Sequence, residues 1–253
     1  MCLIGFHWDP HGPVPLRVAA NRDEFYARPT AAAAWWDDDQ RLGGRDLQAG
    51  GSWMGLSRTG RFAALTNYRD PRRHKPDATS RGALVADFLA SDITASDFLH
   101  ALRGRASAYN DFNLLVFDGR LLLGYESHTD RTLRFGRGAH AVSNGGFDSP
   151  WPKVERLRAA MADDTSLEAQ FALLADTAIA PDARLPSTGV PLEWERALSA
   201  LFIRTPEYGT RASTVLSVSA GHCQFIERSF DHGVFAGEQR FTFSPQADGA
   251  APA

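Results

Sequence analysis

A cysteine stands at the second position of the chain, directly after Met1. If the initiator methionine is removed, which the small side chain of Cys2 permits, a thiol lies next to a free α-amine. That amine titrates at about 7.7–8.0 and can accept the proton of the thiol, which makes Cys2 a nucleophile with its own base. The alternative is that Cys2 is a small buried hydrophobe, as free cysteines commonly are and as we expect for Cys223.

Three further polar residues follow apolar segments and are candidates for chemistry at the same site. Asp23 ends the second apolar segment, and Asn67 and Asn144 each end an expected hairpin strand. Asp23 either supports a nucleophile or is an ordinary charged strand end. Asparagine at such a place commonly serves the local conformation of a turn. The residues alone leave these interpretations open.

The composition excludes several other classes of function. The formal net charge of −3 provides no basic field for nucleic-acid binding, and no window reaches the ~18 apolar residues of a membrane span. Two cysteines are too few for a disulfide framework, so a reduced, cytoplasmic location is expected. The chain has no Gly-x-Ser-x-Gly, phosphate-loop or His-Glu-x-x-His signature, and its eight histidines lack ligand spacing, so we expect no metal site.

A hairpin must position the nucleophile and the carboxylate. Residues 2–8 and 15–22 read as its two strands. Because side chains alternate along a strand, Asn21 and Asp23 are expected on one face and Arg22 on the other. Asn21, which shares the face of Asp23, is a candidate for substrate binding.

The rest of the chain alternates between hairpins and blocks of helices. Residues 27–52 read as an irregular excursion, and a clear hairpin follows that ends in Asn67. Helices are expected at 81–90 with Ser80 as the N-cap, from Thr94 or Ser96 to 102, and at 150–163, 166–176 and 191–201. Strands are expected at 52–56, 61–67, 112–117, 120–125, 131–135, 139–143, 213–219, 222–228 and 239–243.

This order indicates an α+β layered fold rather than a doubly wound parallel sheet, because the strands arrive as antiparallel hairpins and the helices in separate blocks. No linker or internal repeat divides the chain, so residues 1–245 are expected to form one domain. The Ala- and Pro-rich tail, 246–253, is expected to be disordered.

Several short motifs occur in order along most of the chain. They are Cys2 after Met1, Ala19-Ala20-Asn21-Arg22-Asp23-Glu24-Phe25, Gly51-Ser52-Trp53-Met54-Gly55, Ala64-Leu65-Thr66-Asn67-Tyr68-Arg69, Val142-Ser143-Asn144-Gly145, Trp151-Pro152-Lys153 and Tyr208-Gly209-Thr210-Arg211. In these motifs the chain resembles the NRDE family, to which transport and Golgi organisation protein 2-like proteins belong. The resemblance implies an N-terminal-nucleophile (Ntn) hydrolase-like fold, a four-layer αββα sandwich of two antiparallel sheets flanked by helices. It also implies roles in lipid metabolism or haem trafficking.

A more distant similarity is to the choloylglycine hydrolases and penicillin V acylases, which are amidases with an N-terminal cysteine. By this similarity, Cys2 is the nucleophile and Asp23 is the carboxylate that orients the amine and the thiol. Asn67 and Asn144 contribute to positioning and to the oxyanion hole.

The chain departs from those amidases at one arginine. Ala20 replaces the arginine of their Arg-Asn-x-Asp motif, and Arg22 appears instead, where strand alternation is expected to point it the other way. Arg211 is the other candidate for the missing charge. If neither residue supplies this charge, the amidase mechanism lacks one of its charged groups. The direction in which the Arg22 side chain points therefore decides between a hydrolase and a ligand carrier.

Three functions are therefore compared. The first is hydrolysis of an amide, ester or thioester of an apolar acyl substrate without a cofactor, with Trp53, Phe62 and Tyr68 as pocket walls unless they are core residues. The second is a carrier for haem, a lipid or acyl-CoA, in which Arg22 and Arg211 pair with carboxylates or phosphates of the ligand. The third is a protein-interaction role. The sequence names neither the substrate nor the oligomeric state.

Overall fold

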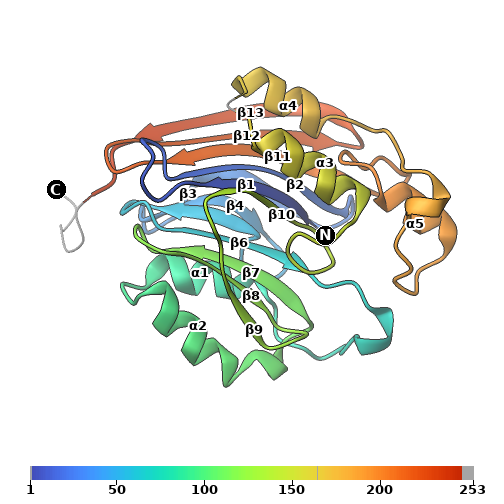
Figure 1. Ribbon diagram of the computed structural model, residues 1–253, viewed down its shortest axis with the longest axis horizontal. Helices are drawn as coiled ribbons and strands as arrows, with labels where there is room; N and C mark the ends of the chain where they lie inside the picture. Colours follow the sequence, from blue (N-terminus) through green and yellow to red (C-terminus); the bar gives the residue numbers. More distant parts are fainter. Residues whose placement is uncertain (1, 164, 247–253) are drawn as a thin grey trace.

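The computed structural model describes residues 2–163 and 165–246, whose strands form two antiparallel sheets stacked face to face (Figure 1). The first sheet contains β1 (Cys2–Trp8), β2 (Leu16–Phe25), β10 (Gly138–Val142), β11 (Tyr208–Val218), β12 (Cys223–Asp231) and β13 (Val234–Phe243). The second contains β3 (Thr30–Trp35), β4 (Arg41–Asp46), β5 (Met54–Ser57), β6 (Phe62–Asn67), β7 (Phe112–Phe117), β8 (Leu122–Glu126) and β9 (Arg131–Arg134). The strand order is β10-β1-β2-β11-β12-β13 in the first sheet and β3 to β9 in sequence in the second.

Helices cover the outer face of each sheet. Within the described residues they are α1 (Gly82–Ala90), α2 (Ala95–Arg103), α3 (Pro152–Met161), α4 (Leu167–Leu174) and α5 (Leu192–Leu198). Helices α1 and α2 lie on the second sheet, and α3 and α4 lie on the first (Figure 1). The resulting order of layers is helix, sheet, sheet, helix, which confirms the predicted α+β fold of two antiparallel sheets flanked by helices.

Three buried hydrophobic clusters join these layers. One lies between the sheets and contains Phe6 and Phe62. Another packs Phe88 of α1 against the second sheet, and a third packs Leu157 of α3 against the first. Because both sheets are covered on two faces, their central strands read as nearly continuous apolar runs rather than as polar and apolar alternation.

Strand β1 lies inside the first sheet and is buried on both faces. Ile4 and Phe6 point into the layer between the sheets, whereas Leu3 packs under the helices. The strand pairs with β2 in a register that places Cys2 opposite Arg22. The predicted hairpin is therefore confirmed, and Cys2 lies on the face that looks toward the second sheet.

Residues 27–52 form β3 and β4, so the interpretation of this segment as irregular is wrong. Gly43 and Gly44 of β4 allow close approach: a Cβ at the first would meet the carbonyl oxygen of Met54, and a Cβ at the second would meet the ring of Trp53. Glycine inside a strand often marks such a close approach. In the sequence alone, the same pair of glycines also indicates the end of a strand. The packing fixes the Trp53 ring beside β2.

The chain crosses from the second sheet to the first between β9 and β10. Gly138 begins β10 with a φ of 131°, a conformation that favours glycine. Strand β10 pairs with β1, with Val142 opposite Ile4. The crossing brings the segment after β10 to the start of β1, where the Ser143 hydroxyl donates to the carbonyl oxygen of Cys2 at 3.1 Å.

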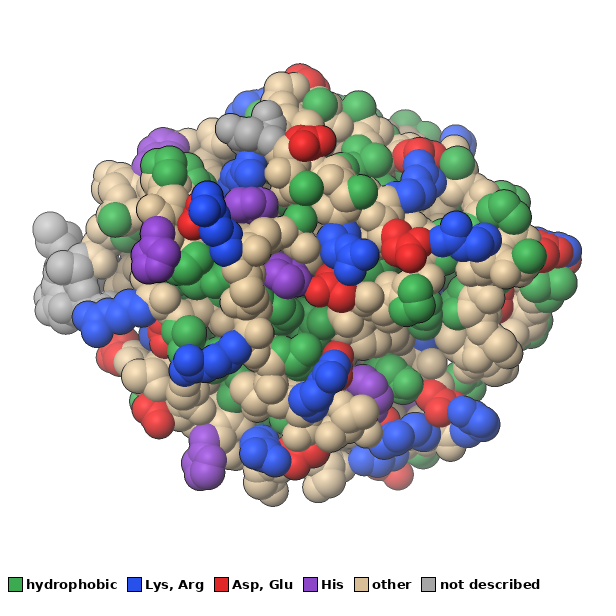
Figure 2. Space-filling model, viewed as in Figure 1, with side chains coloured by type: hydrophobic (Ala, Val, Ile, Leu, Met, Phe, Trp, Pro, Cys, Tyr) green, Lys and Arg blue, Asp and Glu red, His purple; other side chains and the backbone are tan. Residues whose placement is uncertain are grey.

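The surface carries charges of both signs. On the face shown in Figure 2, basic and acidic side chains are interspersed. Many charged side chains of the described residues form ion pairs, such as Arg103 with Asp130 at 2.6 Å, and exposed pairs of this kind contribute little to stability. No helix of the described residues is long and apolar enough to cross a membrane. Of the predicted tail, residues 247–253 lie outside the described residues.

Candidate functional site

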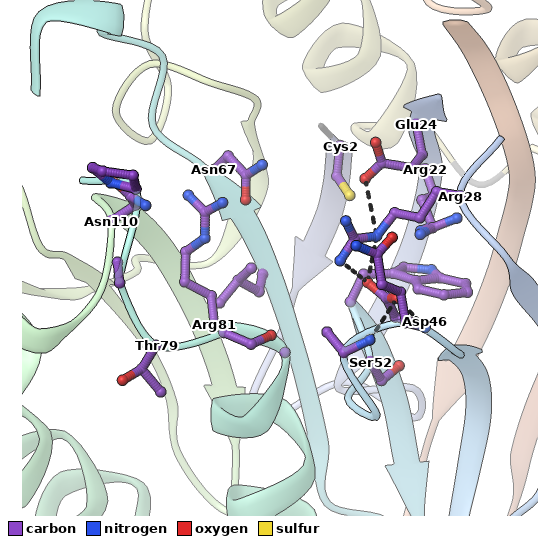
Figure 3. A pocket seen from close by; sticks show the side chains of 18 residues that line it. Cys2, Arg22, Glu24, Arg28, Asp46, Ser52, Asn67, Thr79, Arg81 and Asn110 are labelled. Carbon is purple, nitrogen blue, oxygen red and sulfur yellow. Dashed lines mark hydrogen bonds and ion pairs between the residues drawn. The ribbon is translucent and has the colours of Figure 1, made fainter. Parts of the chain in front are cut away.

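Cys2 faces a cavity of about 420 Å³. The cavity opens where the ends of β1, β2, β4 and β6 meet the start of α1 (Figure 3). Its charged and catalytic candidates are Cys2, Arg22, Glu24, Arg28, Asp46, Asn67 and Arg81. The lining thus combines residues from both sheets and the first helix, which are far apart in the sequence.

Arg22 points into this cavity, on the same side of the sheet as Cys2 and Ala20. The expectation that alternation turns Arg22 away from the side of Ala20 is wrong, because positions two residues apart share a face. The guanidinium carbon lies 4.1 Å from the centre of the Trp53 ring, and Nη1 donates to Oγ1 of Thr30 at 2.9 Å. Arg22 can therefore supply the charge that Ala20 lacks.

The Cys2 thiol is buried, with 7% of the residue exposed. Burial raises the pKa of the thiol, and the positive charge of Arg22 acts in the opposite direction. A thiol in this environment is protonated near neutral pH, so it needs a base before it can attack. Cys2 and Cys223 are both free.

Asp23 and Asn21 lie on the opposite face of β2, as the alternation predicted. The Asp23 carboxylate accepts a hydrogen bond from Oγ1 of Thr210 at 2.7 Å, and burial raises its pKa. The Asn21 amide donates to the carbonyl oxygens of Leu174 and Leu201, each at 2.8 Å. Asn21 therefore ties the helical layer to the sheet and does not line the cavity.

Lys153 is a buried cation near Asp23 that the sequence reasoning did not select. Only 2% of the residue is exposed, and burial lowers its pKa to about 8, while the charge of Asp23 acts in the opposite direction. The sequence signal was its place in the first turn of α3, where the helix dipole disfavours a cation. A cation is kept at such a position when a buried carboxylate compensates for it.

Replacing Lys153 with methionine should change how stability depends on pH. The folded pKa of about 8 lies below the ordinary 10.5, so unfolded chains bind a proton that folded chains have lost between these values. The free energy of unfolding of the wild type should therefore rise across this window, relative to Lys153→Met, by about 3 kcal/mol. Urea unfolding at several pH values measures the difference. Lys75→Met, at an exposed lysine, is the matched control. An equal pH dependence of stability in both variants would contradict the lowered pKa of Lys153.

The two asparagines lie side by side but differ in their access to the cavity. Asn67 lines it, at the end of β6. Asn144 is buried, and its amide donates to the backbone carbonyl of Asn67 at 2.7 Å. Asn113, which the sequence reasoning missed, donates to the carbonyl oxygens of Ser143 and Gly145 at 3.3 and 2.7 Å. Asn144 and Asn113 thus hold the segment that supports Asn67.

Two predicted ligand-binding residues lie outside the cavity. Tyr68 stacks on His128 with ring centres 3.9 Å apart. Arg211 sits at a bulge of β11 and donates to the carbonyl oxygens of Phe25, Tyr26 and Arg28 at 3.3, 2.9 and 3.2 Å. Arg211 therefore closes the turn after β2 and leaves Arg22 as the arginine beside Cys2.

Comparison with known proteins identifies relatives over most of the chain. Residues 1–232 match the family described as Transport and Golgi organisation 2. The Transport and Golgi organization protein 2 homolog of Bos taurus is 37% identical over 260 residues, which cover 90% of this chain and 93% of that protein. The homologs of Homo sapiens and Mus musculus are 34% and 33% identical over the same shares of both chains. The NRDE resemblance is confirmed, and the chain belongs to the Transport and Golgi organisation 2 family.

Proposed function

We propose that the chain is a cysteine hydrolase that acts on an amide, ester or thioester through Cys2. The observation that carries this proposal is the position of the thiol at the cavity wall, opposite Arg22 in the β1–β2 register. Asn67 faces the same cavity from the second sheet, and Asp23 follows Arg22 on the other face of β2. A nucleophile, a cation and an amide donor thus face one cavity, and a carboxylate lies on the opposite face of the strand that carries the cation.

The reaction begins with transfer of the thiol proton to the α-amine of Cys2, which requires removal of the preceding residue. The sulfur attacks the substrate carbonyl carbon, a C–S bond forms, and the carbonyl oxygen becomes an oxyanion. The bond to the leaving group then breaks, and the leaving group takes the proton from the amine. Water attacks the resulting thioester with the amine as base, which releases the acid and restores the thiol.

The residues around Cys2 have separate tasks in this reaction. The Asn67 amide is the oxyanion donor, and Asn144 positions it through the backbone carbonyl of Asn67. Asp23 orients the amine from the opposite face of the sheet. Trp53 and Leu65 are the large apolar residues of the lining, so they contact the acyl group.

A non-catalytic carrier is the second candidate, and the raised pKa of the buried Cys2 thiol favours it. In this role the cavity binds haem, a lipid or acyl-CoA as cargo, and its arginines contact carboxylates or phosphates of that cargo. For haem, Cys2 is the lining residue that can ligate iron.

Intact-mass spectrometry tests the proposed function. The purified chain should have lost its initiator methionine, and brief incubation with 4-nitrophenyl acetate followed by acid should add one acetyl group at Cys2. Cys223→Ala is the matched control because it removes the other thiol and should keep the adduct. A chain that retains Met1, or an adduct that persists in Cys2→Ala, would exclude the mechanism and leave the carrier.

A further inference from the structure

We propose that the ligand of the Cys2 cavity carries an oxyanion group, a carboxylate or a phosphate, which binds between Arg22, Arg81 and the amino end of α1. This inference rests on the proposed function in one respect, namely that the reacting carbonyl lies at Cys2. It changes the expected substrate from a purely apolar acyl compound to an acyl compound with an acidic group.

Arg22 is a buried cation that forms no ion pair within 4.0 Å among the described residues, although the charges of Glu24 and Asp46 act on it from farther away. It is 5% exposed, and its hydrogen bond goes to the neutral hydroxyl of Thr30. The Trp53 ring covers one face of the guanidinium, but a ring does not neutralise a buried charge. Buried charges are generally paired, and Arg22 lines the cavity.

Of the other two arginines of the cavity, Arg28 binds carboxylates, whereas Arg81 binds a backbone carbonyl. Arg28 binds Asp46 at 2.8 Å and lies 4.0 Å from Glu24, so its charge is balanced within the protein. Arg81 donates only to the carbonyl oxygen of Asp111, at 3.1 Å, in the part of the chain that the structure describes. Figure 3 shows Arg81 on the side of the cavity opposite Arg28 and Cys2.

The amino end of α1 is a second, independent indication of an anion. Ser80 was predicted to cap this helix, but the N-cap is Arg81, and no side chain accepts a hydrogen bond there. The first turn contains no acidic residue, and Ser80 and Gly82 line the cavity. The amino end of a helix carries a partial positive charge and binds carboxylates and phosphates through its free N–H groups.

These features indicate where the acidic group of the ligand lies relative to the Cys2 thiol. Cys2, Arg22 and Arg81 line the same cavity, and Arg22 lies opposite Cys2 in the β1–β2 register. An oxyanion bound between the two arginines therefore lies a short distance from the thiol, on the acyl part or on the leaving group. Such a substrate is a monoester, monoamide or thioester of a dicarboxylic acid, or an acyl compound whose leaving group carries a phosphate.

Isothermal titration of inorganic phosphate and of succinate in a low-salt buffer tests the site. Wild type and Cys2→Ala should bind at least one of these anions equally, and Arg81→Gln should weaken that binding at least tenfold. Arg22→Lys, which keeps the charge but loses the planar group, should weaken it less. Arg120→Gln, at an exposed arginine that does not line the cavity, is the matched control. Preference for succinate or for phosphate identifies the chemistry of the acidic group.

The two proposals can fail separately. Equal anion affinity in Arg81→Gln and in wild type, or no binding of either anion, would overturn the inference even if Cys2 forms an acyl adduct. Conversely, Arg81-dependent anion binding in a chain whose Cys2 forms no adduct would support the anion site and exclude the hydrolase. A comparison of 4-nitrophenyl hydrogen succinate with its uncharged methyl ester adds a kinetic measure, since the acidic ester should show the higher kcat/KM.

Discussion

Replacing Cys2 with alanine should lower kcat/KM by more than about a thousandfold on any substrate that the chain hydrolyses. The thiol is the group that forms the covalent bond, and Cys2 is the one cysteine among the described residues that line the cavity. The loss should be almost entirely in kcat, because the arginines that bind the substrate remain. Release of 4-nitrophenol from the acidic and neutral esters measures it directly.

The matched control for this variant is Cys223→Ala. Cys223 is also buried, at 0% exposure, in the same cluster between the sheets, and burial raises its pKa to about 11. Each substitution should cost about 1 kcal/mol of stability through lost packing, so a shared loss of activity would indicate damage to the core. Turnover that survives in Cys2→Ala but falls in Cys223→Ala would contradict the nucleophile assignment.

Local patterns were sufficient to predict the hairpin that carries the site. The apolar runs of β1 and β2, with a proline-containing turn between them, favour only an antiparallel pair. The period of two then places Asn21 and Asp23 together, as the structure confirms. Thr94 was also predicted as an N-cap, and its side chain accepts a hydrogen bond from the Asp97 backbone.

The cavity itself could not be predicted, because its residues meet through tertiary packing. Arg28 and Arg81 come from a turn and a helix start, and no local period relates them to Cys2. The crossing from β9 to β10 depends on which sheet accepts an edge strand, and the two short strand sequences do not specify this. The pairing of Lys153 could not be predicted for the same reason. The carboxylate that compensates it, Asp23, is 130 positions away, and only the packing of α3 on β1 brings the two residues near each other.

Replacing Asp23 with asparagine should destabilise the protein and reduce its activity for two different reasons. At pH 7 the substitution leaves Lys153 as a buried cation without its compensating charge, which should cost about 3–5 kcal/mol of unfolding free energy. It also removes the group that orients the α-amine, and the loss of an orienting carboxylate typically lowers turnover by a thousandfold or more, as in catalytic triads. Urea unfolding and ester hydrolysis measure the two effects.

The double variant Asp23→Asn/Lys153→Met separates them. It removes both buried charges, so a large part of the lost stability should return, as it does when a buried ion pair is replaced as a unit. Turnover should not return, because the amine still lacks its carboxylate. If the double variant hydrolysed esters as fast as Lys153→Met alone, Asp23 would serve only to balance the buried lysine, and the orientation of the amine would have to come from another group around Cys2.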